Sequence, residues 1–203
     1  MKPVRLAILG LGTVGGGALK LLQENAAEIR RRTDREIQVT HVGTRRPRPD
    51  LNLADSIKQS ADLMEIVRQP DVDIVVEVMG GIHPAYELIM EAMKHGKHVV
   101  TANKALLAEH GTALFKAADE YKVQIAYEAA VAGGIPIIKV IREGLAANRI
   151  DGLAGIINGT GNFILSEMRE KGRAFDDVLT EAQDLGYAEA DPTFDVEGID
   201  AAH

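Results

Sequence analysis

The sequence predicts an α/β protein with a doubly wound parallel sheet, followed by part of a second domain of the α+β class. Short apolar runs alternate with stretches of helical period from residue 4 to residue 127. A glycine-rich turn directly follows the first apolar run. The alternation stops near residue 130, so we expect one domain over residues 1–130 and the start of another over residues 131–203.

The elements of the first domain follow from two patterns. Runs that are apolar on both faces indicate buried parallel strands, and amphipathic stretches indicate the helices that cover them. Prolines and polar residues predict a loop over residues 44–60. The predicted strands and helices, in chain order, are residues 4–9, 13–31, 37–42, 62–69, 73–79, 84–95, 97–101, 104–121 and 123–127.

The second domain is predicted to begin with a turn at residues 133–136 that leads into a helix. A longer strand is expected over residues 148–158, and helices over residues 160–171 and 175–185, the last one stopped by Gly186. This mixture predicts the start of a second domain of the α+β class.

Composition removes several classes of function. The 203 residues carry a net charge of −7, which argues against nucleic acid as the main partner. The absence of cysteine excludes disulfides, thiolate metal sites and cysteine nucleophiles. No apolar run approaches the ~20 residues that span a bilayer, and no signal peptide precedes the first strand. We therefore expect a cytoplasmic protein without a membrane partner.

The glycine-rich turn has the spacing of a Rossmann-type dinucleotide-binding loop. Gly10 permits the tight turn, Gly12 leaves room for the pyrophosphate, and Gly15 allows close packing of helix and strand. The backbone N–H groups at Thr13 and Val14 would face the phosphates. A glycine-rich turn that binds no ligand is the alternative interpretation.

The turn after the second strand bears on which dinucleotide binds. It holds Arg45 and Arg46 and no acid, whereas NAD-binding proteins usually place Asp or Glu there. Paired arginines suit a 2′-phosphate, so we expect NADP, with NAD as the alternative cofactor. A solvated basic turn is the other interpretation.

Two further segments hold residues suited to chemistry. Lys104 follows the predicted strand at residues 97–101, at the carboxyl edge of the sheet. An amine there can take a proton from an alcohol if its pKa is lowered, and a surface lysine is the alternative. Five acids lie between residues 189 and 200, a density that suits an ammonium group or a divalent cation. Composition alone favours a solvated acidic loop.

These segments, in this order, resemble the homoserine dehydrogenases over the whole length of the chain. The matching stretches are residues 10–15, 96–104, 128–136, 158–160 and 186–203. The resemblance implies NAD(P)-dependent interconversion of L-homoserine and L-aspartate 4-semialdehyde (EC 1.1.1.3), an oxidoreductase step of threonine and methionine biosynthesis. It also implies that residues 131–203 are the start of a catalytic domain for substrate binding and dimerisation, and that the full-length protein is a homodimer or homotetramer.

The resemblance further implies roles for individual residues. Lys104 and Asp200 would be catalytic, with Lys104 beside the nicotinamide. Glu189, helped by Asp195 and Asp200, would hold the substrate ammonium. The implied substrate-binding residues are Gly159, Thr160, Tyr187, Glu189, Asp195 and Asp200. The implied residues of a monovalent cation site, for Na⁺ or K⁺, are Glu128, Val131, Gly133 and Ile135.

The chain departs from the family pattern at two points. Gly161 stands where the family usually has a second threonine. The lysine assigned as proton donor in the family would follow His203, the last residue here, so we expect a fragment that is inactive by itself. One alternative is therefore a dinucleotide-binding module without turnover. Another is a different semialdehyde or hydroxy-acid reductase, although aspartate-semialdehyde dehydrogenase needs a cysteine that this chain lacks.

Overall fold

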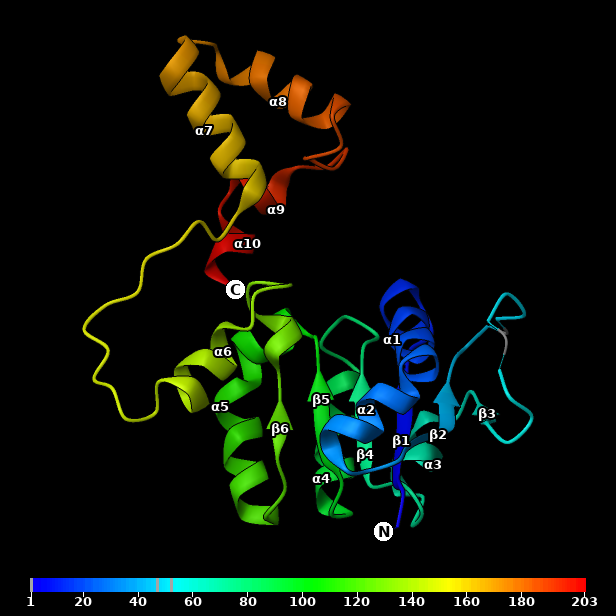
Figure 1. Cartoon of the computed structure of the whole chain (residues 1–203). Helices are drawn as coiled ribbons and strands as arrows, with labels where there is room; N and C mark the ends of the chain where they lie inside the picture. Colours follow the sequence, from blue (N-terminus) through cyan, green and yellow to red (C-terminus); the bar gives the residue numbers. More distant parts are fainter. Residues whose placement is uncertain (1, 47, 52) are drawn as a thin grey trace. The chain divides into compact units, whose positions relative to one another are not determined.

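The computed structural model describes residues 2–46, 48–51 and 53–203 (Figure 1). The chain divides into two compact units, Met1–Gly144 and Leu145–His203, which are described separately below. The domain boundary near residue 130 stays a prediction. No helix in the described part of the chain is both long and apolar enough to cross a membrane.

The first unit is built on a six-stranded sheet in which every pair of neighbouring strands is parallel. The strand order is β3-β2-β1-β4-β5-β6, so the direction of winding reverses between β1 and β4. This arrangement confirms the predicted doubly wound, Rossmann-type fold. The strands are β1 Val4–Leu9, β2 Ile37–Gly43, β3 Lys58–Ser60, β4 Ile74–Glu77, β5 His98–Thr101 and β6 Ile125–Ala126.

Helices cover both faces of this sheet, because its central strands are apolar on both sides. In β1, Ala7 and Leu9 belong to the buried cluster that includes α3, α4 and α5, whereas Leu6 and Ile8 belong to the cluster that includes α1. Burial on both faces is typical of parallel sheets. The helices of this unit up to β6 are α1 Thr13–Glu24, α2 Ala26–Thr33, α3 Leu63–Arg68, α4 Ala85–Lys94 and α5 Lys104–Tyr121.

Two predictions for this unit need correction. The helix expected over residues 13–31 is two helices, α1 and α2, separated at Asn25, whose side-chain amide donates to the carbonyl of Leu21. The loop expected over residues 44–60 contains β3, which pairs with β2 through His41 and Lys58. This short edge strand is polar, so it carries no apolar signal in the sequence.

The end of the first unit is a series of short helical turns. These are the 3₁₀ turn η1 (Glu128–Ala130), the helix α6 (Ile137–Lys139) and the π-helical turn η2 (Val140–Gly144). The predicted turn at residues 133–136 does lead into a helix, since Pro136 is the residue that precedes α6.

The regular secondary structure of the second unit is entirely helical. Its helices are α7 (Gly159–Lys171), α8 (Phe175–Asp184), α9 (Thr193–Val196) and α10 (Ile199–Ala202). Its buried core is small and consists of Ile164, Val178, Ala182 and Ala188.

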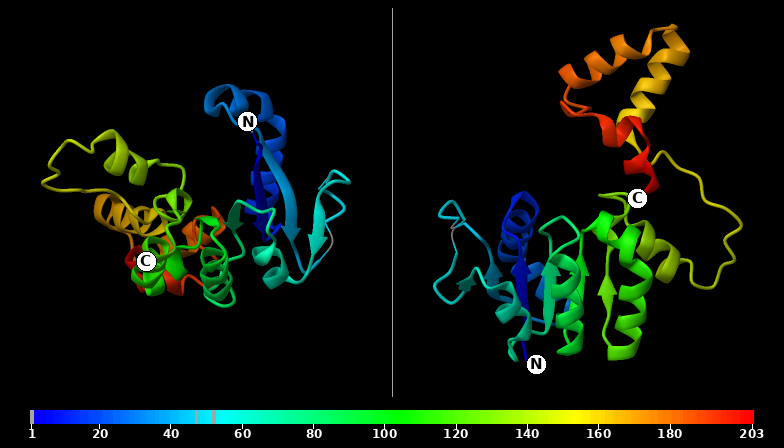
Figure 2. Two further views of the ribbon diagram at one scale, coloured as in Figure 1. Left: turned by 90° about the horizontal axis from the view of Figure 1, so that it is seen from below. Right: turned by 180° about the vertical axis from the view of Figure 1, so that it is seen from behind.

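The strand predicted over residues 148–158 is wrong for this chain. The segment is a loop (Figure 2), and Leu153, Ile156 and Ile157 are each more than 70% exposed, at 73%, 74% and 71%. A strand needs a neighbour to receive its backbone hydrogen bonds. Residues 145–203, all of which the structure describes, contain no such neighbour. The segment has the apolar residues of a strand, but an apolar pattern does not supply a pairing partner.

Candidate active site

The glycine loop between β1 and α1 is tightly closed. Gly10 has a φ of +98°, and a Cβ atom on it would lie 2.9 Å from the carbonyl oxygen of Val78. A Cβ on Gly15 would lie 1.8 Å from the carbonyl oxygen of Gly10, a distance that no side chain can occupy. Both positions therefore require glycine, the first for its conformation and the second for the contact between helix and strand.

The third glycine faces open space. Gly12 precedes α1, no side chain caps this helix, and a Cβ on Gly12 would meet nothing within 4 Å. The first N–H groups of a helix have no acceptor within it. Thr13 and Val14 begin the helix and are exposed, Val14 to 58%. An uncapped helix start beside open space suits an anion, so these residues fit the pyrophosphate of a dinucleotide.

Arg45 and Arg46 lie exposed in the turn after β2. The hydroxyl of Thr44 holds this turn by donating to the carbonyl of Arg46, 2.7 Å away. Sequence reasoning missed a third arginine in the same turn. Arg48 donates to the carbonyl of Leu11 in the glycine loop and forms an ion pair with Asp50 at 2.6 Å. This turn, called the arginine turn below, holds Arg45, Arg46 and Arg48 and thus contacts the glycine loop directly.

Lys104 is the first residue of α5, directly after the carboxyl end of β5. The preceding residue, Asn103, fixes this helix start. Its Oδ1 accepts the N–H of Leu106 at 3.1 Å, and its Nδ2 donates to the carbonyl of Gly81 at 2.6 Å. The cap ties the turn after β5 to the turn after β4. Lys104 therefore begins a helix whose position is set by two strands.

A buried carboxylate lies under these two turns. Glu77, the last residue of β4, is fully buried. Its side chain accepts the backbone N–H of Met79 at 2.9 Å and the hydroxyl of Thr101 at 2.7 Å. Sequence reasoning did not single out Glu77, although an acid at the end of an apolar strand was the available signal.

In the second unit, one asparagine joins two of the predicted acids. The Nδ2 of Asn158 donates to Oδ1 of Asp195 at 2.8 Å and to Oδ2 of Asp200 at 2.9 Å. Its Oδ1 accepts the N–H of Gly161, which caps α7. A Cβ on Gly161 would lie 3.0 Å from that Oδ1, so any larger residue at 161 crowds the cap. Asn158 lies in one of the stretches that match the family but is not among the predicted site residues, and its role becomes visible only in three dimensions.

The other predicted substrate residues lie near the same helix start or on an exposed loop. The hydroxyl of Thr160 donates to the carbonyl of Tyr187 at 2.6 Å, and Gly159 opens the helix that carries Thr160. Glu189 is exposed, and its backbone carbonyl accepts from Gln183 at 3.1 Å. Among the described residues, no group of three or more His, Cys, Asp or Glu is placed to hold a metal ion.

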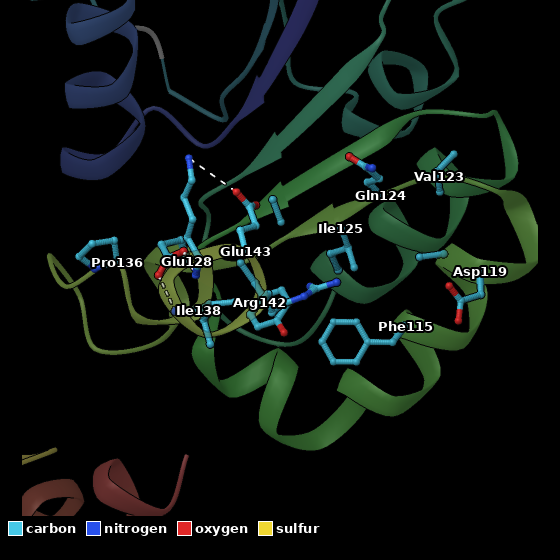
Figure 3. Close-up of a pocket in the computed structure, with 14 residues that line it drawn as sticks. Phe115, Asp119, Val123, Gln124, Ile125, Glu128, Pro136, Ile138, Arg142 and Glu143 are labelled. Carbon is cyan, nitrogen blue, oxygen red and sulfur yellow. Dashed lines mark hydrogen bonds and ion pairs between the residues drawn. The ribbon is translucent and has the colours of Figure 1, made fainter. Parts of the chain in front are cut away.

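Glu128, from the predicted cation site, has a structural use of its own. Its two carboxylate oxygens accept the backbone N–H groups of Ile138 and Lys139, each at 2.9 Å (Figure 3). It thereby caps α6. The cation site at Glu128, Val131, Gly133 and Ile135 stays a prediction.

A hollow of about 810 Å³ lies beside β6, the last strand of the sheet. Phe115 of α5 and Arg142 of η2 line it, and Glu128 lies at its border (Figure 3). The glycine loop, the arginine turn and Lys104 do not line this hollow. The predicted cofactor residues are instead gathered at the carboxyl edge of the sheet, which is where doubly wound sheets bind ligands.

Family comparison covers both parts of the chain. Residues 10–128 match the NAD-binding domain of homoserine dehydrogenase, and residues 136–203 match the homoserine dehydrogenase domain that follows it. The chain belongs to the homoserine dehydrogenase family. It is 62% identical to the homoserine dehydrogenase of Pseudomonas aeruginosa over 203 residues and 58% identical to that of Neisseria gonorrhoeae. Both matches cover all of this chain, but they cover only 46% and 47% of the two relatives. The chain therefore spans about half the length of these relatives.

Solved structures of the homoserine dehydrogenase family have the same fold. The crystal structure of a homoserine dehydrogenase from Thiobacillus denitrificans matches with a TM-score of 0.88 and 60% identity, over 99% of this chain and 47% of that one. A hyperthermophilic archaeal homoserine dehydrogenase in complex with NADPH matches with a TM-score of 0.80 and 30% identity, over 98% of this chain and 66% of that one. The NAD-binding domain supports a nicotinamide dinucleotide as the cofactor.

Proposed function

We propose that the whole protein is an NAD(P)-dependent homoserine dehydrogenase that interconverts L-homoserine and L-aspartate 4-semialdehyde. The observation that carries this proposal is the match of both units to one family, together with a dinucleotide loop in the first unit and an organised pair of carboxylates in the second. The substrate is a small molecule, and the reaction belongs to threonine and methionine biosynthesis. We further propose a cytoplasmic homodimer or homotetramer, for which sedimentation of the whole protein is the test.

The cofactor supplies the acceptor or donor of hydride when it is bound. Gly10, Gly12 and Gly15 shape the loop for its pyrophosphate, and the uncapped start of α1 supplies N–H donors. Arg45 and Arg46 are exposed where a 2′-phosphate would lie, so we propose a preference for NADP over NAD.

The residues proposed to bind the substrate, other than Lys104, belong to the second unit. We propose that Glu189, with Asp195 and Asp200, binds the ammonium group, because carboxylates form charge-assisted hydrogen bonds with it. Asn158 keeps Asp195 and Asp200 together through one amide group. We propose that the substrate pocket is lined by Gly159, Thr160 and Tyr187. Lys104 orients the hydroxyl oxygen and handles its proton, and Asp200 assists it.

Turnover by the whole protein tests the reaction. We expect homoserine-dependent reduction of NADP⁺, measured by absorbance, and oxidation of NADPH with aspartate 4-semialdehyde. Lys104→Met is expected to lower kcat by about 100-fold or more, since general acid–base groups contribute about 10²–10⁴-fold. Lys116→Met, on the same helix but away from the carboxyl edge, is the matched control. No turnover in either direction by the unsubstituted protein contradicts the proposal.

Calorimetry tests the cofactor preference. We expect this chain to bind NADPH more tightly than NADH, and the double substitution Arg45→Ala with Arg46→Ala to remove the difference. Arg30→Ala, an exposed arginine of α2, is the control and should leave the preference intact. Tighter binding of NADH by the unsubstituted chain contradicts the NADP proposal.

A second candidate applies to residues 1–203 taken alone, namely dinucleotide binding without turnover. The proposed cofactor residues all lie in the first unit, whereas the substrate residues other than Lys104 lie in the second. Binding of NADPH without homoserine oxidation by this chain supports the candidate. Homoserine oxidation well above background by the same chain rules it out.

A further inference from the structure

Two turns meet at the carboxyl edge of the sheet, one after β4 and one after β5. The first, residues 78–81, also contacts the end of β1, because the N–H of Val78 donates to the carbonyl of Leu9 at 3.0 Å. The second, residues 102–104, ends at Lys104. Among the described residues, a long backbone hydrogen bond joins the second turn to the end of β4, from the N–H of Ala102 to the carbonyl of Glu77 at 3.3 Å.

Side chains connect the two turns through an unbroken series of hydrogen bonds. The N–H of Met79 donates to the Glu77 carboxylate, which also accepts the hydroxyl of Thr101. The same hydroxyl oxygen accepts the N–H of Asn103 at 3.0 Å, and the Asn103 side chain returns to the carbonyl of Gly81. Glu77 and Thr101 are fully buried, and Asn103 is 6% exposed, so water does not compete for these bonds.

The chemistry of the series requires an acceptor at position 77. Backbone N–H groups can donate and cannot accept, so Met79 and Asn103 fix the direction at both ends. The hydroxyl of Thr101 accepts from Asn103 and must therefore send its own proton to Glu77. A carboxylate accepts from both sides. An amide at position 77 presents its NH₂ either to Met79 or to Thr101 and leaves a buried donor without an acceptor.

The series lies below the part of the sheet edge where the nicotinamide half of the cofactor would extend. The arginine turn follows β2, and the residue after the second strand of this fold faces the ribose of the adenosine half. The strands β4 and β5 lie across the switch point from β2, so the other half of the dinucleotide extends over their carboxyl ends.

We propose that Glu77 is a positioning residue, which fixes the turns at residues 78–81 and 102–104 and thereby orients the nicotinamide half of the cofactor and Lys104. The part that concerns Lys104 rests on the proposed function. Glu77 acts through Thr101 and Asn103, and it lies below the surface that the cofactor would contact.

Binding of a whole dinucleotide and of its adenosine half tests this assignment. The probes are NADPH and 2′-phospho-ADP-ribose, which lacks the nicotinamide, titrated into this chain by calorimetry. We expect Glu77→Gln to weaken the binding of NADPH by about tenfold, which corresponds to the loss of roughly one buried hydrogen bond. The affinity for 2′-phospho-ADP-ribose should stay within about twofold of the unsubstituted value. Equal weakening of both probes, or of neither, overturns the proposal.

Two controls separate positioning from a loss of stability. Val75→Ala truncates a buried side chain of the same strand and should lower the melting temperature without changing the ratio of the two affinities. Thr101→Val removes the hydroxyl and should reproduce the selective loss of NADPH binding. Thr101→Ser keeps the hydroxyl and should bind NADPH as the unsubstituted chain does. Thr101→Val also carries the test if Glu77→Gln does not fold.

A double-mutant cycle gives the sharpest result. If Glu77 and Thr101 act in one series, the combined substitutions Glu77→Gln and Thr101→Val weaken NADPH hardly more than either alone. Additive losses overturn the series. None of these measurements uses homoserine, so a whole protein without homoserine turnover contradicts the proposed function and leaves this test intact.

Discussion

The two units of the chain hold their functional residues in different ways. In the first, the glycine loop, the arginine turn and Lys104 all follow strands of one sheet, which is buried on both faces. In the second, Asp195 and Asp200 lie in or beside short helices and are joined by one amide group. The first site is set by the backbone of a large core, and the second by a few side-chain hydrogen bonds.

The buried apolar core is also much larger in the first unit than in the second. The first unit has two large apolar clusters, one on each face of the sheet, whereas the second has Ile164, Val178, Ala182 and Ala188. Since apolar burial is the main favourable term in folding, the second unit has less to offset its conformational entropy. We therefore expect it to open locally at a lower free energy than the first.

The largest expected effect is at Gly15. Gly15→Ala places a Cβ 1.8 Å from the carbonyl oxygen of Gly10, so α1 must move away from β1. We expect a loss of at least about 3 kcal/mol in the free energy of unfolding, and of NADPH binding by about 100-fold or more, because overpacking against backbone cannot be relieved by a rotamer. Urea unfolding and calorimetry measure the two losses.

Gly17 provides the matched control in the same helix. A Cβ at Gly17 would meet nothing within 4 Å, so Gly17→Ala is expected to raise the free energy of unfolding by about 0.5–1 kcal/mol. If Gly15→Ala behaves like Gly17→Ala, the first unit is less rigid at its phosphate loop than the packing indicates, and the contrast between the units weakens.

A pair of isoleucines compares the two cores directly. Ile89 in α4 is fully buried and Ile164 in α7 is 4% exposed. Truncation to alanine should cost about 2–5 kcal/mol at either site. In the first unit we expect a lower melting temperature for the whole sheet. In the second we expect faster hydrogen exchange in α7 and α8 with the sheet unaffected. Faster exchange in the sheet after Ile164→Ala contradicts independent units.

The sheet could be predicted from the sequence because its signal is local. The runs that form β1 and β4 are largely apolar on both faces, the run that forms β5 contains two adjacent valines, and glycines or helical stretches bound all three. The edge strand β3 was missed since its three residues are polar. The segment at residues 148–158 has an apolar pattern but no pairing partner, and pairing is a property of the fold and not of the segment.

The candidate site was predictable where function depends on spacing. Gly10, Gly12 and Gly15 are recognised from sequence because each meets a separate requirement of one short turn. Glu77, Arg48 and Asn158 were not, because each has a decisive partner 24 or more positions away along the chain, at Thr101, Leu11 and Asp195 respectively. A side chain that acts through distant partners leaves no local pattern.

A pH-dependent effect is expected in the first unit from His41. Its ring is buried in β2, and its Nε2 has no hydrogen-bond partner among the described residues. Burial lowers the pKa of His41 below its usual value, Asp71 and Glu65 oppose this shift, and Lys58 adds to it. The unfolded chain therefore takes up the proton first. Stability is complete above the unfolded pKa, about 6.5, and falls as the pH drops below it, by at most about 1.4 kcal/mol per pH unit.

Urea unfolding followed by circular dichroism between pH 5 and 8 checks this prediction. His41→Gln should flatten the fall below pH 6.5, whatever it does to stability at neutral pH. His95→Gln changes an exposed histidine and should keep the fall. An unchanged slope in His41→Gln shows that other groups carry the pH dependence.

The smallest effect is expected on the exposed helix α2, which contributes no buried side chain. Arg31 and Arg32 donate to the carboxylate of Glu28 and lower its pKa to about 2. These three side chains are open to solvent, so ions compete for their contacts, and at 1 M salt the screening length is only about 3 Å. We expect NMR titration to find a depressed pKa of Glu28 at low salt that returns toward its usual value at 1 M NaCl.

Glu28→Gln should leave the melting temperature unchanged. A depressed carboxyl pKa adds stability only at a pH above the pKa of the unfolded chain, and solvent screens most of that contribution. A pKa that stays near 2 at high salt would mean that α2 is held more firmly than its exposure indicates, and that the rigidity of the first unit extends beyond its buried sheet.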